Sequence, residues 1–377
     1  MRLVLNKEGW SRFRFDEIAQ KISKTVSPAE TDLERYIGLE HIDAEDIHIR
    51  RWGSPSDVKG GKLLCYPGDI IFGKRRAYQR KAAIVEEESI CSAHAFVFRA
   101  IEGVILPEFL PFFLHSDSFM NRMVDISVGG LSPTINWGDL KHQEFRLPPK
   151  DQQAELAELL WSINTVVEKA RCLGQRFEEL LLSAMKEKLS KSTHKEKLID
   201  LCLNKPKYGA NSPSKPYDNH TRYIRITDIE EFGALSTKPV SAKDSESKYI
   251  LKYGDFLLAR TADPGRAYYY RNQDGRCIYA GYLIKFELDM KKILPEFLFF
   301  FTQTKEFKSW INQTTRKGTL SNINSQEFSN MRVPLFSIDQ QRKIINDISY
   351  YRNILTEARD NLTSCLDLHS SVINQIF

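Results

Sequence analysis

The sequence predicts an α+β fold made by tandem duplication: an α/β domain followed by a long α-helix, twice over. Two observations support this prediction. Short motifs recur at a nearly constant offset along the 377-residue chain, and two long segments carry apolar side chains at coiled-coil spacing. We therefore expect two domains, at residues 1–150 and 191–338, and two helices, at residues 151–190 and 339–377.

The internal repeat consists of motifs that return in the same order. Arg-Tyr-Ile at 35–37 recurs at 222–224, and Leu-Pro-Glu-Phe-Leu at 106–110 recurs at 294–298. Asp-Gln-Gln at 151–153 recurs at 339–341, and Pro-Gly-Asp-Ile-Ile-Phe at 67–72 corresponds to Tyr-Gly-Asp-Phe-Leu-Leu at 253–258. Because these offsets all lie between 186 and 188 residues, chance similarity is a poor explanation.

Each half has the same predicted order of elements. We expect strands at residues 69–73, 82–85 and 93–99, and again at 255–260, 267–270 and 283–286. Short aromatic-rich helices follow near 108–115 and 118–124, and near 296–302 and 306–313, before a glycine turn at 128–130 or 316–318. The first long helix begins after Pro149, whereas Ser337 and Gln340 form a capping-box pattern at the second.

The long helices are predicted from apolar residues spaced alternately by three and four. The seam of the first helix contains Leu156, Leu159, Ile163, Val166, Leu173, Phe177 and Leu180. The seam of the second contains Ile344, Ile348, Tyr351, Leu355, Leu362, Val372 and Ile376, interrupted only by His369. A helix of this length extends about 60 Å, far more than an average globular helix, so we expect it to link separate bodies. Two alternatives remain: the seams bury each other, or each helix packs on its own domain.

Composition restricts the possible classes of protein. With 54 Lys and Arg against 49 Asp and Glu, the chain is mildly basic, which permits a nucleic-acid ligand but does not require one. The six cysteines form no CxxC pair, so we expect reduced thiols and no zinc site. The start of the chain lacks the apolar core of a signal peptide, and no apolar run could span a membrane. A cytoplasmic protein is therefore expected.

A basic loop follows the central predicted strand in each half. The first contains Lys74, Arg75, Arg76, Tyr78, Gln79, Arg80 and Lys81, and the second contains Arg260, Thr261, Arg266, Tyr268, Tyr269 and Arg271. Such loops suit double-stranded DNA, because cations neutralise phosphates, arginine can bind guanine and glutamine can bind adenine. The alternative is a solvated charged hairpin, but recurrence at the same position in both halves favours DNA binding. The two loops differ in sequence, which fits two sites that read different bases.

Three further features are weaker candidates for DNA contact. Lys205, Lys207, Tyr208 and Asn211 form a polar loop that opens the second domain, and either a phosphate contact or a plain surface loop explains it. Lys317 lies in the second glycine turn. His94 interrupts an apolar strand, where a hydrogen-bonded core histidine is favoured over a base contact, and Gly281 is its expected counterpart.

The sequence contains no recognisable active site. It has no phosphate-binding loop of the form GxxxxGK[ST] and no glycine-rich loop for a dinucleotide or S-adenosylmethionine. It also has no cluster of metal ligands. We therefore expect a chain that binds no cofactor and has no catalytic activity of its own.

Taken together, the chain resembles the specificity subunit of a type I restriction–modification system. The resemblance rests on residues 67–76 and 253–266, on the domain-to-helix junctions at 135–153 and 323–341, on the repeated Tyr-Ile pair, and on Tyr-Gly-Ala-Asn at 208–211. It implies two target-recognition domains, each reading one half of a bipartite DNA site. It also implies that the long helices pair as an antiparallel coiled coil that sets the gap between the half-sites.

The resemblance further implies partner proteins. Two modification subunits would dock on the helices and methylate adenine with S-adenosylmethionine, and an ATP-dependent restriction subunit would join them. S-Adenosylmethionine, ATP and Mg²⁺ are therefore expected on the partners. Two other classes remain as hypotheses: a coiled-coil adaptor that binds only protein, and a stand-alone DNA-modifying enzyme.

Overall fold

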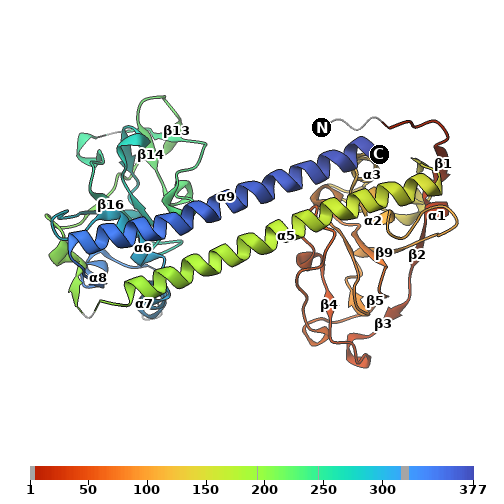
Figure 1. Ribbon diagram of the computed structural model, residues 1–377, viewed down its shortest axis with the longest axis horizontal. Helices are drawn as coiled ribbons and strands as arrows, with labels where there is room; N and C mark the ends of the chain where they lie inside the picture. Colours follow the sequence, from red (N-terminus) through yellow and green to blue (C-terminus); the bar gives the residue numbers. More distant parts are fainter. Residues whose placement is uncertain (1–4, 193, 245, 316–321) are drawn as a thin grey trace. The chain divides into compact units, whose positions relative to one another are not determined.

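The computed structural model describes residues 5–192, 194–244, 246–315 and 322–377. The chain forms two compact units (Figure 1). Unit 1 comprises Met1–Cys172 and Arg359–Phe377, and unit 2 comprises Leu173–Ala358. Each unit thus combines one globular part with a portion of both long helices. The boundaries of the four predicted segments stay a prediction.

Unit 1 is built around a four-stranded antiparallel sheet with the order β2-β9-β6-β7. Its strands are Ala19–Ile22, Ala95–Ala100, Ile70–Gly73 and Ala82–Ile84. A second sheet has the order β3-β5-β8-β4 and consists of Thr25–Val26, Lys62–Cys65, Ser89–Cys91 and Tyr36–Ile37. A third, two-stranded sheet pairs β1 (Ser11–Arg14) with β10 (Glu144–Leu147). Strand β6 is apolar throughout because both of its faces are covered: Ile70 and Phe72 enter one core cluster and Ile71 enters another.

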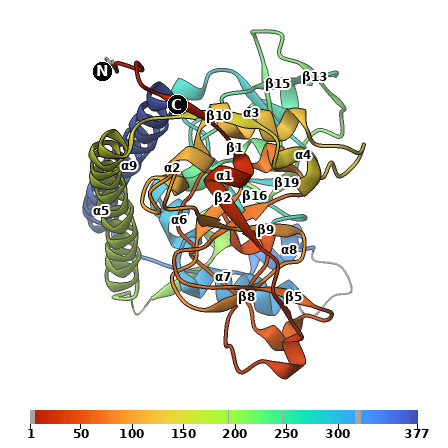
Figure 2. The ribbon, with the colours of Figure 1, turned by 90° about the vertical axis from the view of Figure 1, so that its right-hand side faces the viewer.

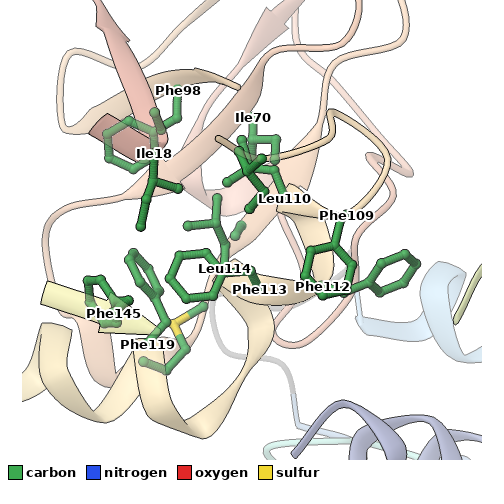
Figure 3. Packing of buried hydrophobic residues seen from close by; sticks show 14 of the residues in the cluster. Ile18, Ile70, Phe98, Phe109, Leu110, Phe112, Phe113, Leu114, Phe119 and Phe145 are labelled. Atoms are coloured by element: carbon green, nitrogen blue, oxygen red, sulfur yellow. The ribbon is translucent and has the colours of Figure 1, made fainter. Parts of the chain in front are cut away.

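Short helices cover the face of this sheet that carries Ile70 and Phe72. They are α1 (Phe15–Ile18), α2 (Leu110–His115), α3 (Asp117–Asp125) and α4 (Trp137–Leu140). Figure 3 shows part of the resulting core, with Phe98, Phe119 and Phe145 labelled. The ring centroid of Phe15 lies 5.0 Å, 5.4 Å and 6.2 Å from the centroids of these three rings, respectively. Helix α2 lies between the sheet and the long helix α5 (Figure 2). Aromatic burial therefore joins the sheet to the helices.

Unit 2 repeats this topology, which confirms the tandem duplication. Its main sheet has the order β12-β19-β16-β17, from Lys207–Tyr208, Leu283–Glu287, Asp255–Ala259 and Ala267–Tyr269. The other pairs are β11-β20 (Lys195–Lys197, Arg332–Pro334), β13-β15 (Ser214–Pro216, Val240–Ala242) and the parallel β14-β18 (Arg222–Ile224, Cys277–Tyr279). The helices are α6 (Pro295–Thr302), α7 (Lys305–Thr315) and α8 (Ser325–Ser329). The six predicted strands and four predicted short helices all exist, whereas the turn at 316–318 lies outside the described residues.

The two long helices are α5 (Lys150–Leu189) and α9 (Ile338–Ile376). Within unit 1, Leu156 and Leu160 from the start of α5 share a core with Val372 and Ile376 from the end of α9. Within unit 2 the opposite ends meet: Leu181, Met185 and Leu189 share a core with Ile344, Ile345 and Ile348, and Lys188 Nζ lies 2.6 Å from Asp347 Oδ2. The helices therefore pair antiparallel, as expected. Both also pack on the domains, so the alternative of each packing on its own domain alone is wrong.

Burial agrees with the predicted seam of α9, but with only half of the seam predicted for α5. Every predicted seam residue of α9 is buried or half-buried. On α5, Leu159, Val166, Leu173 and Leu180 are exposed, and the neighbouring positions Leu160, Val167, Gly174 and Leu181 are buried instead. Two apolar rows with the same heptad period run side by side on this helix, so the spacing alone cannot select between them. The buried row also contains Gln153, Asn164 and Gly174. Because these residues do not have apolar side chains, the apolar pattern of this row is interrupted in the sequence.

The repeated Asp-Gln-Gln motif fastens each long helix to its domain. Gln153 Oε1 accepts from the Leu106 N–H at 2.9 Å, and Gln153 Nε2 donates to the carbonyls of Val104 and Pro148, both at 2.9 Å. Gln341 makes the same bonds in unit 2, accepting from Leu294 N–H and donating to two carbonyls. Leu106 and Leu294 begin the two Leu-Pro-Glu-Phe-Leu copies, so one buried amide explains why both motifs recur together.

Replacing Gln153 with Leu should therefore destabilise unit 1. The apolar side chain would leave one N–H and two C=O groups of the backbone buried without their partner, each at a cost of about 1–3 kcal/mol. We expect a loss of roughly 3 kcal/mol or more in the free energy of unfolding, measured by urea denaturation. Glu155→Leu, at an exposed position on the same helix, is the control and should change stability by less than about 0.5 kcal/mol. Equal effects of the two variants would refute the proposed role of Gln153.

A second test concerns the phase of the α5 seam. Leu181 is 1% exposed and Leu180 is 50% exposed, so the same Leu→Ala substitution samples both apolar rows. We expect Leu181→Ala to cost about 2–5 kcal/mol and Leu180→Ala less than about 1 kcal/mol in denaturant unfolding. A larger loss of stability in Leu180→Ala than in Leu181→Ala would instead support the seam predicted from the sequence.

Candidate nucleic-acid interface

The two basic loops leave equivalent ends of the two main sheets. In unit 1, Gly73 at the end of β6 pairs with Ala95 at the start of β9, so Lys74 and His94 follow side by side. In unit 2, Ala259 pairs with Leu283, which places Arg260 beside Tyr282. The register therefore makes Tyr282, and not Gly281, the counterpart of His94. His94 is also exposed, so the prediction of a core histidine is wrong.

In unit 1 this sheet end forms a basic groove. The groove has a volume of about 450 Å³, and it is lined by Arg75, Arg76, Gln79, Lys81 and His94 together with one carboxylate, Glu40. Arg75 and Arg76 are exposed, and neither forms an ion pair with any described residue. A concave surface whose guanidinium groups form no ion pair is suited to an anionic ligand such as the DNA backbone.

The histidine in this groove forms a hydrogen bond with Arg75. Arg75 Nη1 lies 3.3 Å from His94 Nε2. Because a guanidinium can only donate, His94 Nε2 must accept, and the ring proton resides on Nδ1. Partial burial, together with the charges of Arg75 and Lys74, lowers the pKa of His94. Lys74 lies over the ring of Phe96 at 5.3 Å, and its pKa is likewise lowered, by burial and by Lys21.

Other residues of the first loop maintain its shape. Arg76 and Arg80 adopt left-handed backbone conformations with φ of 54° and 51°, which is unfavourable for residues with a side chain. The conformation is held by Arg76 N–H donating to Pro133 and by Arg80 pairing with Glu45 and Asp117, each at 2.7 Å. Lys81 Nζ donates to the Leu39 carbonyl at 2.6 Å. Arg80 and Lys81 thus have partners within the domain, whereas the exposed Tyr78 and the half-buried Gln79 are accessible.

In unit 2 the corresponding sheet end presents an arginine on an aromatic ring. Arg260 Nε donates to Asn322 Oδ1 at 3.1 Å, and its guanidinium lies 5.0 Å from the centroid of Tyr208. Tyr208 is fixed by Ser325, whose Oγ lies 3.1 Å from the phenol oxygen and whose N–H donates to it. Gly209 allows this placement, because a Cβ there would collide with the carbonyl oxygens of Tyr279 and Ala280.

Several predicted contacts in the second domain need correction. Tyr268 and Tyr269 are 0% and 9% exposed, so they cannot contact DNA as predicted. They alternate on β17, and each face of that strand is covered by a different core cluster. Arg271 pairs with Asp274 at 2.9 Å and donates to the Gly233 carbonyl, and Arg266 pairs with Asp263 at 2.6 Å. These arginines have internal partners.

The remaining candidates lie on the surface or outside the described residues. Lys205, Lys207 and Asn211 are exposed, and Thr261 is half-buried. Lys317 falls in 316–321, outside the described residues. Sequence reasoning missed Tyr282, which is 62% exposed, and Asn322. Tyr282 could have been found as an exposed aromatic residue directly before a buried strand, but Asn322 gave no local signal.

Within the part of the chain that the structure describes, no three potential metal-ligating side chains meet, and no helix is long and apolar enough to cross a membrane. All six cysteines are free thiols. The chemistry gathered at the two sheet ends consists instead of cations, aromatic rings and amides, which are groups that bind nucleic acid.

The duplicated fold and its basic sheet ends define a class of DNA-specificity protein, and sequence comparison identifies the family. The chain matches the type I restriction modification DNA specificity domain over residues 7–172 and again over 191–363, and it belongs to that family.

Individual relatives agree with this assignment. The chain is 27% identical over 165 residues to the specificity subunit of the type I restriction enzyme EcoDI from Escherichia coli, a match that covers 42% of this chain and 36% of that relative. The fold is similar to that of a type I restriction–modification specificity subunit from M. genitalium, with a TM-score of 0.53 and 15% identity over 100% of this chain and 98% of the other. A chain from a structural study of complex assembly in a type I R-M system aligns with a TM-score of 0.63 at 18% identity, covering 97% of both chains.

Proposed function

We propose that this chain is the DNA-specificity subunit of a type I restriction–modification complex and that each domain reads one half of a bipartite DNA site. One observation carries the proposal: at the same end of the equivalent sheet, the two domains present different side chains. Lys74, Arg75 and His94 stand at this end in unit 1, and Arg260 and Tyr282 stand there in unit 2. Equivalent positions with unlike side chains are what two readers of different sequences require.

The two long helices would hold the readers at a set spacing and dock two modification subunits. The exposed apolar row of α5 supports docking. Leu159 and Val166 in unit 1, and Leu173 and Leu180 in unit 2, are 38–53% exposed at seven-residue spacing. Apolar side chains with a heptad period fit the face of another helix, so a partner helix would bury them.

The proposed division of labour leaves the chemistry to the partners. The modification subunits would methylate adenine with S-adenosylmethionine, and the restriction subunits would use ATP and Mg²⁺. This chain would contribute recognition alone. This division fits the described sheet ends, where the polar groups that cluster are cations and amides rather than acid–base or nucleophilic pairs.

A map of methylated bases in the host genome, with and without the gene, tests this function. A split motif whose adenine methylation disappears on deletion would give both half-sites and the gap at once. Unchanged methylation in a host that expresses both the chain and its modification subunit would contradict the DNA-specificity role and favour a protein-only adaptor.

Changing the first loop should alter only one half-site. Arg75 and Arg76 line the groove of unit 1, so their replacement with Ala should remove contacts worth about 1–3 kcal/mol each, or roughly 5- to 150-fold in affinity per contact. The methylation map of this variant should show a relaxed or lost first half and an unchanged second half. Equal changes in both halves would disprove the two-reader proposal.

Docking can be tested on the exposed row of α5. Val166→Glu places a charge on the proposed interface and should weaken binding of the modification subunit at least tenfold, measured by co-purification and analytical ultracentrifugation. Thr165→Glu introduces the same side chain at the adjacent exposed position, outside the apolar row, and should have a smaller effect. Both variants should unfold like the parent chain. If assembly persists equally in both, the row is not the docking surface.

A further inference from the structure

Arg260 differs from the other arginines of the second recognition loop in what holds it. Arg266 and Arg271 are bound to Asp263 and Asp274, so nearby carboxylates compensate their charges. Arg260 forms no ion pair with any described residue, and its one side-chain hydrogen bond among them uses Nε. The charge of Arg260 therefore remains available to a ligand.

The contacts of Arg260 fix its plane and leave its tip open. Asn322 Oδ1 holds the Nε edge at 3.1 Å, and the ring of Tyr208 lies beneath the guanidinium at 5.0 Å. Ser325 in turn fixes the phenol of Tyr208. Neither terminal nitrogen, Nη1 or Nη2, has a hydrogen-bond partner among the described residues. The side chain thus presents a pre-oriented fork of two donors, and little conformational entropy remains to be lost when that fork binds.

A fork of this kind matches guanine. In the major groove, guanine offers two acceptors, O6 and N7, whose spacing suits a bidentate arginine. A phosphate can accept the same two bonds, but only a base contact makes affinity depend on one base pair. We propose that Arg260 is a specificity-determining residue that reads one guanine in the half-site of the second domain, and that Tyr208, Asn322 and Ser325 position it. This inference rests on the proposed function and adds the base that is read.

The test uses the complex of this chain with its modification subunit, and duplexes in which each base pair of the mapped site is changed in turn. For the parent complex, replacing one G·C pair of the second half-site should lower affinity about 5- to 150-fold. Arg260→Ala should abolish discrimination at that pair alone. Arg260→Lys keeps a cation but not the planar fork, so it should lose most of the same discrimination and retain the salt dependence of binding. Arg332→Ala, an exposed arginine on β20, is the matched control and should leave the base profile unchanged.

The positioning residues have their own readout. Tyr208→Leu and Asn322→Ala should each reduce discrimination at the pair that Arg260 reads and leave the other pairs unchanged. Tyr208→Phe keeps the aromatic face and should restore most of the loss caused by Tyr208→Leu. A merely structural role would instead lower affinity for every duplex, and Phe and Leu would then behave alike.

The outcomes separate this inference from the proposed function. If Arg260→Ala weakens all duplexes evenly and reduces the salt dependence by about one phosphate contact, Arg260 binds the backbone and the inference is wrong while DNA specificity stands. If the parent complex shows no base preference in either half-site, the proposed function fails and the inference fails with it.

Discussion

The burial of apolar side chains between α5 and α9 is the constraint on which the rest of the structure depends. Each helix contributes to the core of both compact units, so neither globular part is built without both helices. The antiparallel direction follows from this sharing, because the start of α5 meets the end of α9 in one unit and the reverse holds in the other. Gln153 and Gln341 then fix the rotation of each helix against its domain with three buried hydrogen bonds apiece. Directional bonds complement apolar packing here, since burial alone does not specify orientation.

The two copies of the domain agree where side chains are buried and differ where they are exposed. Asp69 and Asp255 are both buried at the start of the central strand, and each pairs with a cation on the neighbouring strand, Arg99 in one copy and Lys285 in the other. At the opposite end of the same strands, by contrast, the side chains differ, with Lys74 and His94 in one copy and Arg260 and Tyr282 in the other. A buried carboxylate without its partner is costly, so that pair must persist, whereas an exposed side chain is free to change. This asymmetry lets one scaffold serve two recognition tasks.

The sequence predicted the duplication, the strands and the helices because these depend on local pattern and on repetition. It failed where the outcome depends on which of two faces becomes buried. Leu159 and Leu160 differ by one position, yet one is 38% exposed and the other fully buried, and heptad spacing is satisfied by both. Tyr268 and Tyr269 looked like loop aromatics because they follow Arg266, but β17 is covered on both faces. Asn322 and Tyr282 were missed because their relation to Arg260 arises from strand register and tertiary packing, which a local window does not contain.

A net charge of +5 is small for a protein proposed to bind DNA. The ion pairs around the recognition loops explain why a larger positive charge is not needed for specific binding. Most arginines near the recognition loops are bound to neighbouring carboxylates: Arg80 to Glu45 and Asp117, Arg225 to Asp228, Arg266 to Asp263 and Arg271 to Asp274. These pairs contribute to loop geometry and attract phosphates only weakly. Lys74, Arg75, Arg76 and Arg260, which stand at the two sheet ends, are among the described cations without such a partner. Because unspecific affinity grows with the number of neutralised phosphates, each arginine that is paired internally at these loops favours discrimination by base contacts over indiscriminate binding.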